Sequence, residues 1–382
     1  MRGRILMISV LVAASVATPV AAADVSPQAI VETVAVAGGP CGNAALGANC
    51  QGYFPDVVQD PTSGDLLLVY RWSSAHSMQA SELRMKRSTN GGVSWGAAET
   101  IAVAPDTDYR DPAIAAIRSG AHAGRLLLTY FVANATTGAS QASRVRYKDP
   151  GMTAFSGGTI MKSSNLTGPY TTSKAVALAN GQVLMPVYGS PTAGGPQRAA
   201  VIVSTDGGVT FDGTITGHQK TVGSSDTIYY QEPAIAELEP GHVMMIIRSQ
   251  TKPGGVTTDG PGYQSDSYDN TYMSTWTAPI SRGVRMHAPE LVLIPGTNLY
   301  PVVWSEPNSP TNKTYRPVNM KLRHTNVLWE NTTTHRLYSP ASGWDAGYSS
   351  TIPLSTTQLL TAVYDTSRRA VLTLRYTTTD VG

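Results

Sequence analysis

The stretch YQEPAIAELEPGHVMMIIR, residues 230–248, contains the pattern that the rest of the chain repeats. It reads as a short apolar strand, a tight turn at Pro240-Gly241 and a second apolar strand that ends on a charged residue. Five other segments share this layout: residues 54–71, 111–130, 173–188, 288–304 and 348–364. Six hairpins therefore follow one template.

The hairpins recur at a nearly constant spacing. The equivalent positions are Phe54, Asp111, Ser173, Glu232, Ala288 and Tyr348, which are 57, 62, 59, 56 and 60 residues apart. A ring of four-stranded blades needs roughly 40 to 60 residues per blade. With 36 Gly, 25 Pro and no long segment of helical periodicity, the chain is predicted to be all-β, a six-bladed β-propeller of four-stranded antiparallel blades over residues 53–382.

The N-terminal segment has the features of an export signal. Residues 1–23 combine two arginines, a mostly apolar run and small residues near Ala23, which predicts a cleaved signal peptide and a secreted protein. An uncleaved membrane anchor is the alternative. Residues 24–52 are expected to be a lead-in segment in which Cys41 and Cys50, the only cysteines, form a disulfide or remain free thiols.

Composition narrows the range of partners. The net charge is +2 and 14% of the residues are charged, so no broad basic face for nucleic acid or an anionic membrane is indicated. No cluster with metal-ligand spacing is visible, and we expect no metal and no cofactor. We expect a monomer.

Two near-identical octapeptides mark turns between strands. They are STNGGVSW at residues 88–95 and STDGGVTF at residues 204–211. The Asn or Asp side chain can bond nearby backbone N–H groups, the glycines allow positive φ, and the final aromatic packs beneath the turn. We therefore assign Asn90 and Asp206 a structural role. The polar loop at residues 251–270 is either part of a substrate wall, an ion site or a solvated surface loop.

Side chains at the entry end of the innermost strands converge on a propeller axis. Blades four and six would bring Glu232 and Tyr348 towards each other there. A glutamate beside a phenol can accept its proton as the oxygen attacks, which makes the phenol a usable nucleophile. A neutral nucleophile is useful against a reacting carbon that bears a carboxylate, because an anionic one would be repelled.

These motifs resemble the sialidase superfamily. The octapeptides are similar to its Asp-box, and Glu232, Arg248, Arg316 in YRPVNMK and Tyr348 in GYSS match its Glu, second Arg, third Arg and Tyr in order. The resemblance implies a secreted exo-acting, retaining glycoside hydrolase that acts on an oligosaccharide, polysaccharide or glycoconjugate. It also implies that Tyr348 is the nucleophile, Glu232 its base, and Arg248 with Arg316 the clamp for a substrate carboxylate.

The first blade departs from the family pattern. GYFP at residues 52–55 stands where the family has Phe-Arg-Ile-Pro, and the segment at residues 73–79 lacks the family's catalytic Asp. His76 lies in that segment and is a candidate proton donor or hydroxyl-binding residue, with Asp111 and Asp56 as alternative acids.

Two arginines and one aspartate complete the candidate substrate-binding residues. Arg110 either replaces the missing Arg from blade two or pairs with Asp111. Arg71 occupies blade one's counterpart of Arg248 and is either a pocket cation or a strand-end residue. Asp56 lies two residues after Phe54, the equivalent position of blade one.

Two other functions remain open. Glu232 and Glu306, in WSE at residues 304–306, resemble the paired glutamates of an exo-arabinanase family with the same fold. Alternatively, the chain is a non-catalytic sugar-binding propeller.

Overall fold

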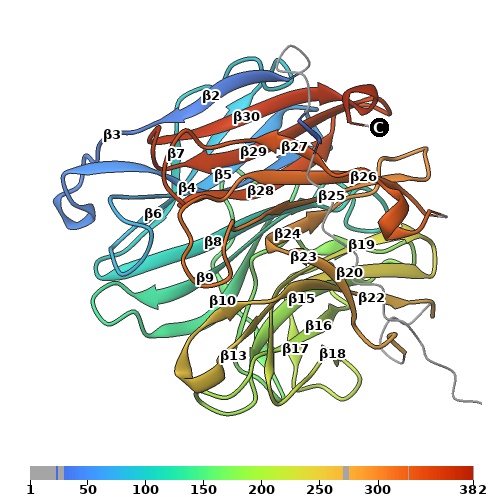
Figure 1. Ribbon diagram of the computed structural model, residues 1–382. Coiled ribbons are helices and arrows are strands. Elements are labelled where there is room, and N and C mark those ends of the chain that lie inside the picture. Colours follow the sequence, from blue (N-terminus) through green and yellow to red (C-terminus); the bar gives the residue numbers. More distant parts are fainter. Residues whose placement is uncertain (1–22, 25–29, 270–274, 326, 382) are drawn as a thin grey trace, which may run out of the picture.

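The computed structural model describes residues 23–24, 30–269, 275–325 and 327–381 (Figure 1). The predicted signal peptide lies outside this part of the chain apart from Ala23, which with Asp24 forms the short strand β1 (Ala23–Asp24). Within the described residues, no helix is long and apolar enough to span a membrane.

The predicted β-propeller with six blades is confirmed. Each blade is built on an antiparallel sheet, in which the innermost strand and the next two strands outward follow one another along the chain. Neighbouring blades contact one another all round the ring through strands β4, β8, β15, β19, β24 and β28 and through the pair β10 and β13. The innermost position of each sheet therefore faces a common axis.

The first three blades differ in regularity. Blade one contains β4 (Asn49–Gln59), β5 (Leu66–Ser73), β6 (Glu82–Ser88) and β7 (Glu99–Val103), with β3 (Gly39–Pro40) beside β4. Blade two contains β8 (Thr107–Ala116), β9 (Leu126–Asn134), β10 (Ser140–Lys148) and β11 (Thr159–Ile160). Blade three has a broken inner strand, and contains β13 (Thr167–Tyr170), β14 (Val176–Ala177), β15 (Val183–Ser190), β16 (Arg198–Ser204) and β18 (Gln219–Gly223). Strands β12 (Lys162–Ser163) and β17 (Asp212–Gly213) form a small parallel pair.

The last three blades complete the ring. Blade four contains β19 (Ile228–Glu239), β20 (His242–Thr251), β21 (Thr258–Asp259), β22 (Pro261–Ser267) and β23 (Ile280–Arg285). Blade five contains β24 (His287–Leu291), β25 (Leu299–Ser305), β26 (Val318–His324) and β27 (His335–Tyr338), with β1 parallel to β27. Blade six contains β28 (Ala346–Pro353), β29 (Gln358–Asp365) and β30 (Ala370–Thr377). Short 3-10 turns lie at η1 (Ala44–Leu46), η2 (Pro253–Gly255), η3 (Trp329–Asn331) and η4 (Thr378–Asp380).

The fourth strand of blade six comes from the N-terminal side of the chain. Strand β2 (Val31–Ala37) pairs antiparallel with β30 as the outermost strand. The predicted disulfide between Cys41 and Cys50 is present and ties the segment after β2 to the start of β4. Residues 24–52 are thus more than a lead-in segment, because they close the ring between the last blade and the first.

The strands are apolar because blades pack face to face. All eight residues of β5 are buried, and Leu67 and Val69 of blade one pack with Ile114 and Leu128 of blade two. Strands covered on both faces read as continuous apolar runs, with no alternation of apolar and polar residues. This explains the apolar hairpins from which the repeat was recognised.

Both octapeptides form self-contained turns at the outer part of their blades. Asn90 accepts from the Ser94 N–H at 3.0 Å, and Asp206 accepts from the Val209 and Thr210 N–H groups, each at 3.0 Å. Phe211 is buried beneath the second turn. These contacts are structural, as expected.

The same backbone distortion recurs near the start of five innermost strands. Phe54, Asp111, Glu232, Ala288 and Tyr348 have φ values of 51°, 45°, 46°, 41° and 46°, and each lies at a register shift in its hairpin. Such a φ costs a residue other than glycine about 1 to 2 kcal/mol. Strained bulges are common at functional sites, so five of them at one level of the ring mark this level as a candidate site. In blade three, Ser173 lies in the gap between β13 and β14.

Candidate active site

The bulges of blades four and six bring together the two residues at the centre of the site. Glu232, on β19, is 5% exposed, and its Oε1 accepts a hydrogen bond of 2.9 Å from the Tyr348 hydroxyl of β28. The same oxygen accepts from Arg248 at 2.6 Å, and Oε2 accepts from the Ala288 N–H at 2.7 Å. The carboxylate is therefore held from three directions, while Tyr348 is only partly buried.

The protonation states of this pair follow from its surroundings. Burial alone would raise the pKa of Glu232, but the charge of Arg248 and the hydrogen bonds that the carboxylate accepts hold this pKa below its ordinary value. Burial raises the pKa of Tyr348 well above that of a free phenol, and the charge of Glu232 raises it further. At neutral pH the pair is a carboxylate that accepts a hydrogen bond from a neutral phenol.

Asp111 supplies a second carboxyl group from the bulge of blade two. Burial raises its pKa to about 7, and the negative charge of Glu232 adds to the effect while Arg110 opposes it. Its Oδ1 is buried and has no hydrogen-bond partner among the described residues. A carboxyl group that is half protonated near pH 7 beside an ionised one is the usual arrangement of an acid and its partner.

Phe54 and Tyr188 enclose the same space. The Phe54 ring lies 5.0 Å from that of Tyr348 between centroids. Tyr53, the residue before Phe54, stands where the resemblance predicts Arg. Tyr188, at the end of β15, is close enough to Glu232, Asp111 and Tyr348 for their charges to raise its pKa in addition to the larger effect of burial. Sequence analysis missed Tyr188, although it ends the third hairpin where blade four has Arg248.

The two arginines of the predicted clamp contact other groups of the protein. Arg248 donates to Glu232 at 2.6 Å and to Asp259 at 3.4 Å. Arg316 has a side chain only 2% exposed, and it donates to the Ala346 carbonyl at 2.6 Å and to the Tyr364 hydroxyl at 3.0 Å. Both guanidinium groups donate to internal partners in this structure, and their binding of a substrate carboxylate stays a prediction.

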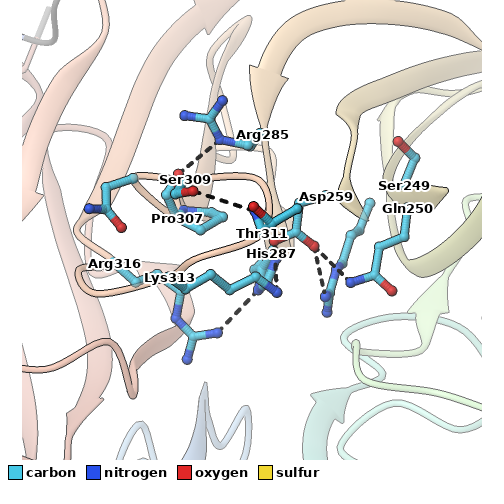
Figure 2. Close-up of polar contacts among 12 residues, drawn as sticks. Ser249, Gln250, Asp259, Arg285, His287, Pro307, Ser309, Thr311, Lys313 and Arg316 are labelled. Atoms are coloured by element: carbon cyan, nitrogen blue, oxygen red, sulfur yellow. Dashed lines mark hydrogen bonds and ion pairs between the residues drawn. The ribbon is translucent and has the colours of Figure 1, made fainter. Parts of the chain in front are cut away.

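Asp259 and His287 link these two arginines (Figure 2). The Asp259 carboxylate accepts from Gln250 at 2.7 Å, and its Oδ2 lies 2.9 Å from His287 Nε2 and 2.8 Å from Lys313 Nζ. On the other side of the imidazole, Arg316 Nη1 lies 3.2 Å from Nδ1. Because Arg316 can only donate, His287 carries its proton on Nε2 and directs it to Asp259.

The charges of this link are well defined. Burial lowers the pKa of His287 to about 3, and the nearby charge of Arg248 contributes, so the imidazole is neutral. Burial opposes ionisation of Asp259, but the contacts with His287, Gln250 and Lys313 hold its pKa far below the ordinary value. Asp259 lies in the polar loop at residues 251–270, which is therefore anchored to the site through this residue and is not only a solvated loop.

Arg71 is a structural residue. Its side chain is 0% exposed and donates to Asp108 at 2.7 Å and to the carbonyls of Ala75 and Gln79. The burial and these three contacts fit neither an exposed strand-end residue nor a free pocket cation, the two alternatives for Arg71.

Arg110 is placed differently from the other arginines. It is partly exposed, and its guanidinium carbon lies 5.5 Å from the ring centroids of both Phe54 and Phe131. Its Nε is buried without a partner, and Arg110 forms no ion pair with Asp111. Of the four arginines singled out in the sequence, Arg110 is the one whose side chain has no hydrogen bond or ion pair among the described residues.

His76 lies at the edge of the site. Its Nδ1 is 2.9 Å from Asp345, and its ring packs edge-on against Phe54 with centroids 5.0 Å apart. Burial lowers the pKa of His76, and the hydrogen bond to Asp345 only partly offsets this. At neutral pH His76 is a neutral imidazole whose Nδ1–H points at Asp345, which suits a hydroxyl-binding residue better than a proton donor.

Asp56 belongs to a cross-brace below the site. Lys174 of blade three lies 2.8 Å from Asp56 of blade one and bonds to Glu290 of blade five and Ser350 of blade six. Asp56 also accepts from Ser350 at 2.6 Å and from the Ile114 N–H at 3.2 Å. Its oxygens are satisfied within the protein, so Asp56 is neither a free acid nor a free substrate ligand.

The cross-brace divides the axial channel. A void of about 30 Å³, large enough for a water molecule, lies between it and the bulge residues Phe54, Asp111 and Tyr348. Beyond the brace, an apolar cavity of about 690 Å³ opens at the other mouth of the channel. The Tyr348 site therefore has a closed floor.

Glu306 does not form the predicted pair with Glu232. Its carboxylate accepts from the Trp304 indole at 3.3 Å and from Asn319 at 2.6 Å, both on its own blade. The carboxyl group that shares the site with Glu232 is that of Asp111. In the described parts of the chain, no group of three or more His, Cys, Asp or Glu side chains could hold a metal ion.

Several solved structures share this fold at low sequence identity. A protein of unknown function from Dyadobacter fermentans has a TM-score of 0.72 at 15% identity over 91% of this chain and 98% of that one. An alpha-L-arabinanase from Penicillium chrysogenum, solved with arabinobiose, has a TM-score of 0.60 at 14% identity over 93% and 100%. The NanB sialidase of Streptococcus pneumoniae, as its K499G mutant, has a TM-score of 0.58 at 13% identity over 87% and 69%.

Sequence comparison identifies the family. No curated protein sequence matches the chain significantly. The profile of the BNR repeat-like domain matches residues 61–317, which is more than half of the chain. The chain therefore belongs to the BNR repeat-like domain family.

Proposed function

We propose that the protein is a retaining, exo-acting glycoside hydrolase in which Tyr348 attacks the anomeric carbon, Glu232 accepts the phenol proton and Asp111 is the general acid. The observation that carries the proposal is the 2.9 Å hydrogen bond from the Tyr348 hydroxyl to a Glu232 carboxylate that is ionised and held in place. The sialidase and arabinanase folds of the structural neighbours support the reaction class.

Tyrosine is the better nucleophile of the pair. Both oxygens of Glu232 are occupied by donors and the side chain is buried, whereas Tyr348 is partly exposed at the axis. A carboxylate in this position is well placed to receive a proton and poorly placed to form a bond with substrate.

The reaction proceeds in two balanced steps. In the first, the Tyr348 oxygen bonds to the anomeric carbon as the bond to the leaving-group oxygen breaks. The phenol proton passes to Glu232, and Asp111 protonates the leaving group. In the second, water attacks the same carbon and gives its proton to Asp111, while the bond to Tyr348 breaks and Glu232 returns the proton to the phenol oxygen. The anomeric configuration is retained.

The closed floor favours a chain end as substrate. The cross-brace of Asp56, Lys174, Glu290 and Ser350 blocks the channel directly below the bulge residues. A terminal sugar can enter such a pocket from one side, whereas an internal unit needs an open groove. The disulfide between Cys41 and Cys50 supports export to an oxidising compartment, so we also propose that the enzyme is secreted.

The test is hydrolysis by purified protein of a panel of aryl glycosides, sialosides and arabinans, with NMR of the first-formed anomer. We expect retention of configuration and loss of activity in Tyr348→Phe. Tyr338→Phe is the matched control, because it removes another buried phenol bond, to Asp365 at 2.5 Å. Binding of a sugar without any cleavage would instead support a sugar-binding propeller.

A further inference from the structure

Three of the four arginines near the site donate to other groups of the protein. Arg71 is buried against Asp108 and two carbonyls, Arg248 is bonded to Glu232 and Asp259, and Arg316 donates to the Ala346 carbonyl and the Tyr364 hydroxyl. Arg110 alone among them has a side chain without a hydrogen bond or ion pair to any described residue. A guanidinium with its donors unused is suited to bind an acceptor from outside the protein.

The two arginines next to the nucleophile already contact other groups of the protein. Arg316 lies between the rings of Tyr348 and Trp344, each with its centroid 5.3 Å from the guanidinium carbon. Arg248 is covered by Glu232, whose negative charge would repel a second carboxylate. A carboxylate on the anomeric carbon itself would therefore compete with Glu232 for Arg248 and with the internal partners of Arg316.

Arg110 is fixed at a short distance from that carbon. Its guanidinium packs on the rings of Phe54 and Phe131, which restrict its movement without using its N–H groups. Phe54 also contacts Tyr348, with 5.0 Å between ring centroids. Two groups that touch the same phenyl ring are within reach of one monosaccharide, so Tyr348 and Arg110 can hold different carbons of one sugar.

The charges of Asp111 and Asp108 act on Arg110, but neither carboxylate forms an ion pair with it among the described residues. Glu232 lies against Arg248, Asp345 against Arg316, and Asp259 against Lys313. Asp111, the neighbour of Arg110, makes no ion pair with it and is protonated in the state that acts as acid. When Asp111 is protonated, the guanidinium of Arg110 on the blade-two side has no paired carboxylate.

We infer that the substrate is a glycoside of a uronic acid, in which the carboxylate on the ring carbon far from the glycosidic bond binds Arg110 and the anomeric carbon carries no carboxylate. This inference rests on the proposed hydrolase function and adds the substrate class. A neutral phenol as nucleophile suits such a substrate, because its negative charge would repel an attacking carboxylate.

The test compares matched pairs of 4-methylumbelliferyl glycosides: glucuronide against glucoside, and galacturonide against galactoside, in both anomers, with a sialoside included. We expect kcat/KM to be about 10- to 100-fold higher for a uronide than for its neutral partner, the size of a charge-assisted hydrogen-bonded contact. Arg110→Gln should remove this preference mainly through KM, while Arg110→Lys retains part of it. Arg118→Gln makes the same change of charge at the opposite mouth, where Arg118 donates to the Gln59 carbonyl, and should change nothing.

The outcomes separate this inference from the proposed function. Equal turnover of uronides and neutral glycosides, or turnover of the sialoside alone, overturns the inference while hydrolysis itself stands. Calorimetric titration of Tyr348→Phe with glucuronate, galacturonate, glucose and galactose gives an independent readout. A preference for a uronate that disappears in the Arg110→Gln, Tyr348→Phe double variant supports the inference, and equal or absent binding contradicts it. Failure to hydrolyse any glycoside overturns the proposed function.

Discussion

Tyr348 and Glu232 are 116 residues apart in the chain, yet the Tyr348 hydroxyl donates a 2.9 Å hydrogen bond to Glu232 Oε1. The two residues occupy the same strained position in blades six and four, with φ of 46° in each. The contact is therefore a product of the repeat, because the same bulge in two blades displays two different side chains towards one axis.

Tyr348→Phe should lower kcat/KM by roughly 10³-fold or more, because the variant keeps the ring but lacks the attacking oxygen. The unfolding midpoint should change little, since a partly exposed hydroxyl is lost. Mass spectrometry of the wild-type protein quenched with a slowly turned over 2-fluoro glycoside should locate the sugar on the peptide that contains Tyr348. A sugar on the Glu232 peptide would assign the attack to the carboxylate instead.

Glu232→Gln should reduce kcat by roughly 10²- to 10⁴-fold, because the amide cannot accept the phenol proton. KM should change much less, since the variant keeps the shape of the pocket. Steady-state kinetics on the best substrate from the panel provide the measurement. Glu306→Gln is the matched control, because this glutamate bonds only to Trp304 and Asn319 on its own blade. An equal loss in both variants would contradict the assigned role of Glu232.

The rate should fall as pH rises through the pKa of Asp111. Burial raises this pKa to about 7, and a general acid must carry its proton, so kcat/KM should decrease above about pH 7. In Asp111→Asn the alkaline limb should disappear together with most of the activity towards poor leaving groups. Activity towards nitrophenyl leaving groups, which need little protonation, should be retained better.

His76→Gln tests the other candidate acid with the same pH profile. Because His76 is neutral at pH 7 and its Nδ1–H faces Asp345, the alkaline limb should persist in this variant. If the limb is lost in His76→Gln and kept in Asp111→Asn, the general acid is the histidine.

Lys174→Met should destabilise the fold by about 3 to 5 kcal/mol, because Asp56 and Glu290 would remain buried without their cation. The loss should be smaller at pH 5 than at pH 8. Removing the cation raises the folded-state pKa of both carboxyl groups. Protonation of these groups then stabilises the folded state at low pH, and this stabilisation is lost as pH rises through the raised pKa. Chemical unfolding at the two pH values measures this. Lys162→Met removes an exposed ion pair with Asp212 and should cost less than about 1 kcal/mol.

Much of the architecture could be read from local patterns. The apolar hairpins are visible because strands packed between blades are buried on both faces, and five of the six equivalent positions taken from their spacing have the same strained φ. The ring closure by β2 was not predicted, because residues 31–37 look like any short strand until β30 is beside them. The two octapeptide turns were predictable because all their hydrogen bonds lie within eight residues.

The roles of the charged residues were less predictable. Glu232, Tyr348 and Asp111 follow from the repeat, since the bulge determines where each side chain points. Arg71 and Arg248 occupy equivalent positions, but Arg71 is buried against Asp108, and this partner is not part of the template. Asp259 and His287 were missed because their importance comes from partners 9 to 54 residues away.

The sequence by itself determined the number of blades, the position of each inward-facing residue and the pairing of a glutamate with a tyrosine, because these depend on a pattern repeated within each hairpin. The tertiary structure alone decided which arginine is free to meet a substrate. Whether a guanidinium hydrogen-bonds within the protein depends on the side chains that surround it, many of which come from neighbouring blades. Contacts between blades leave no periodic signal in the sequence. In this protein these contacts pair Arg71, Arg248 and Arg316 with other groups of the protein. The Arg110 side chain has no hydrogen bond or ion pair among the described residues.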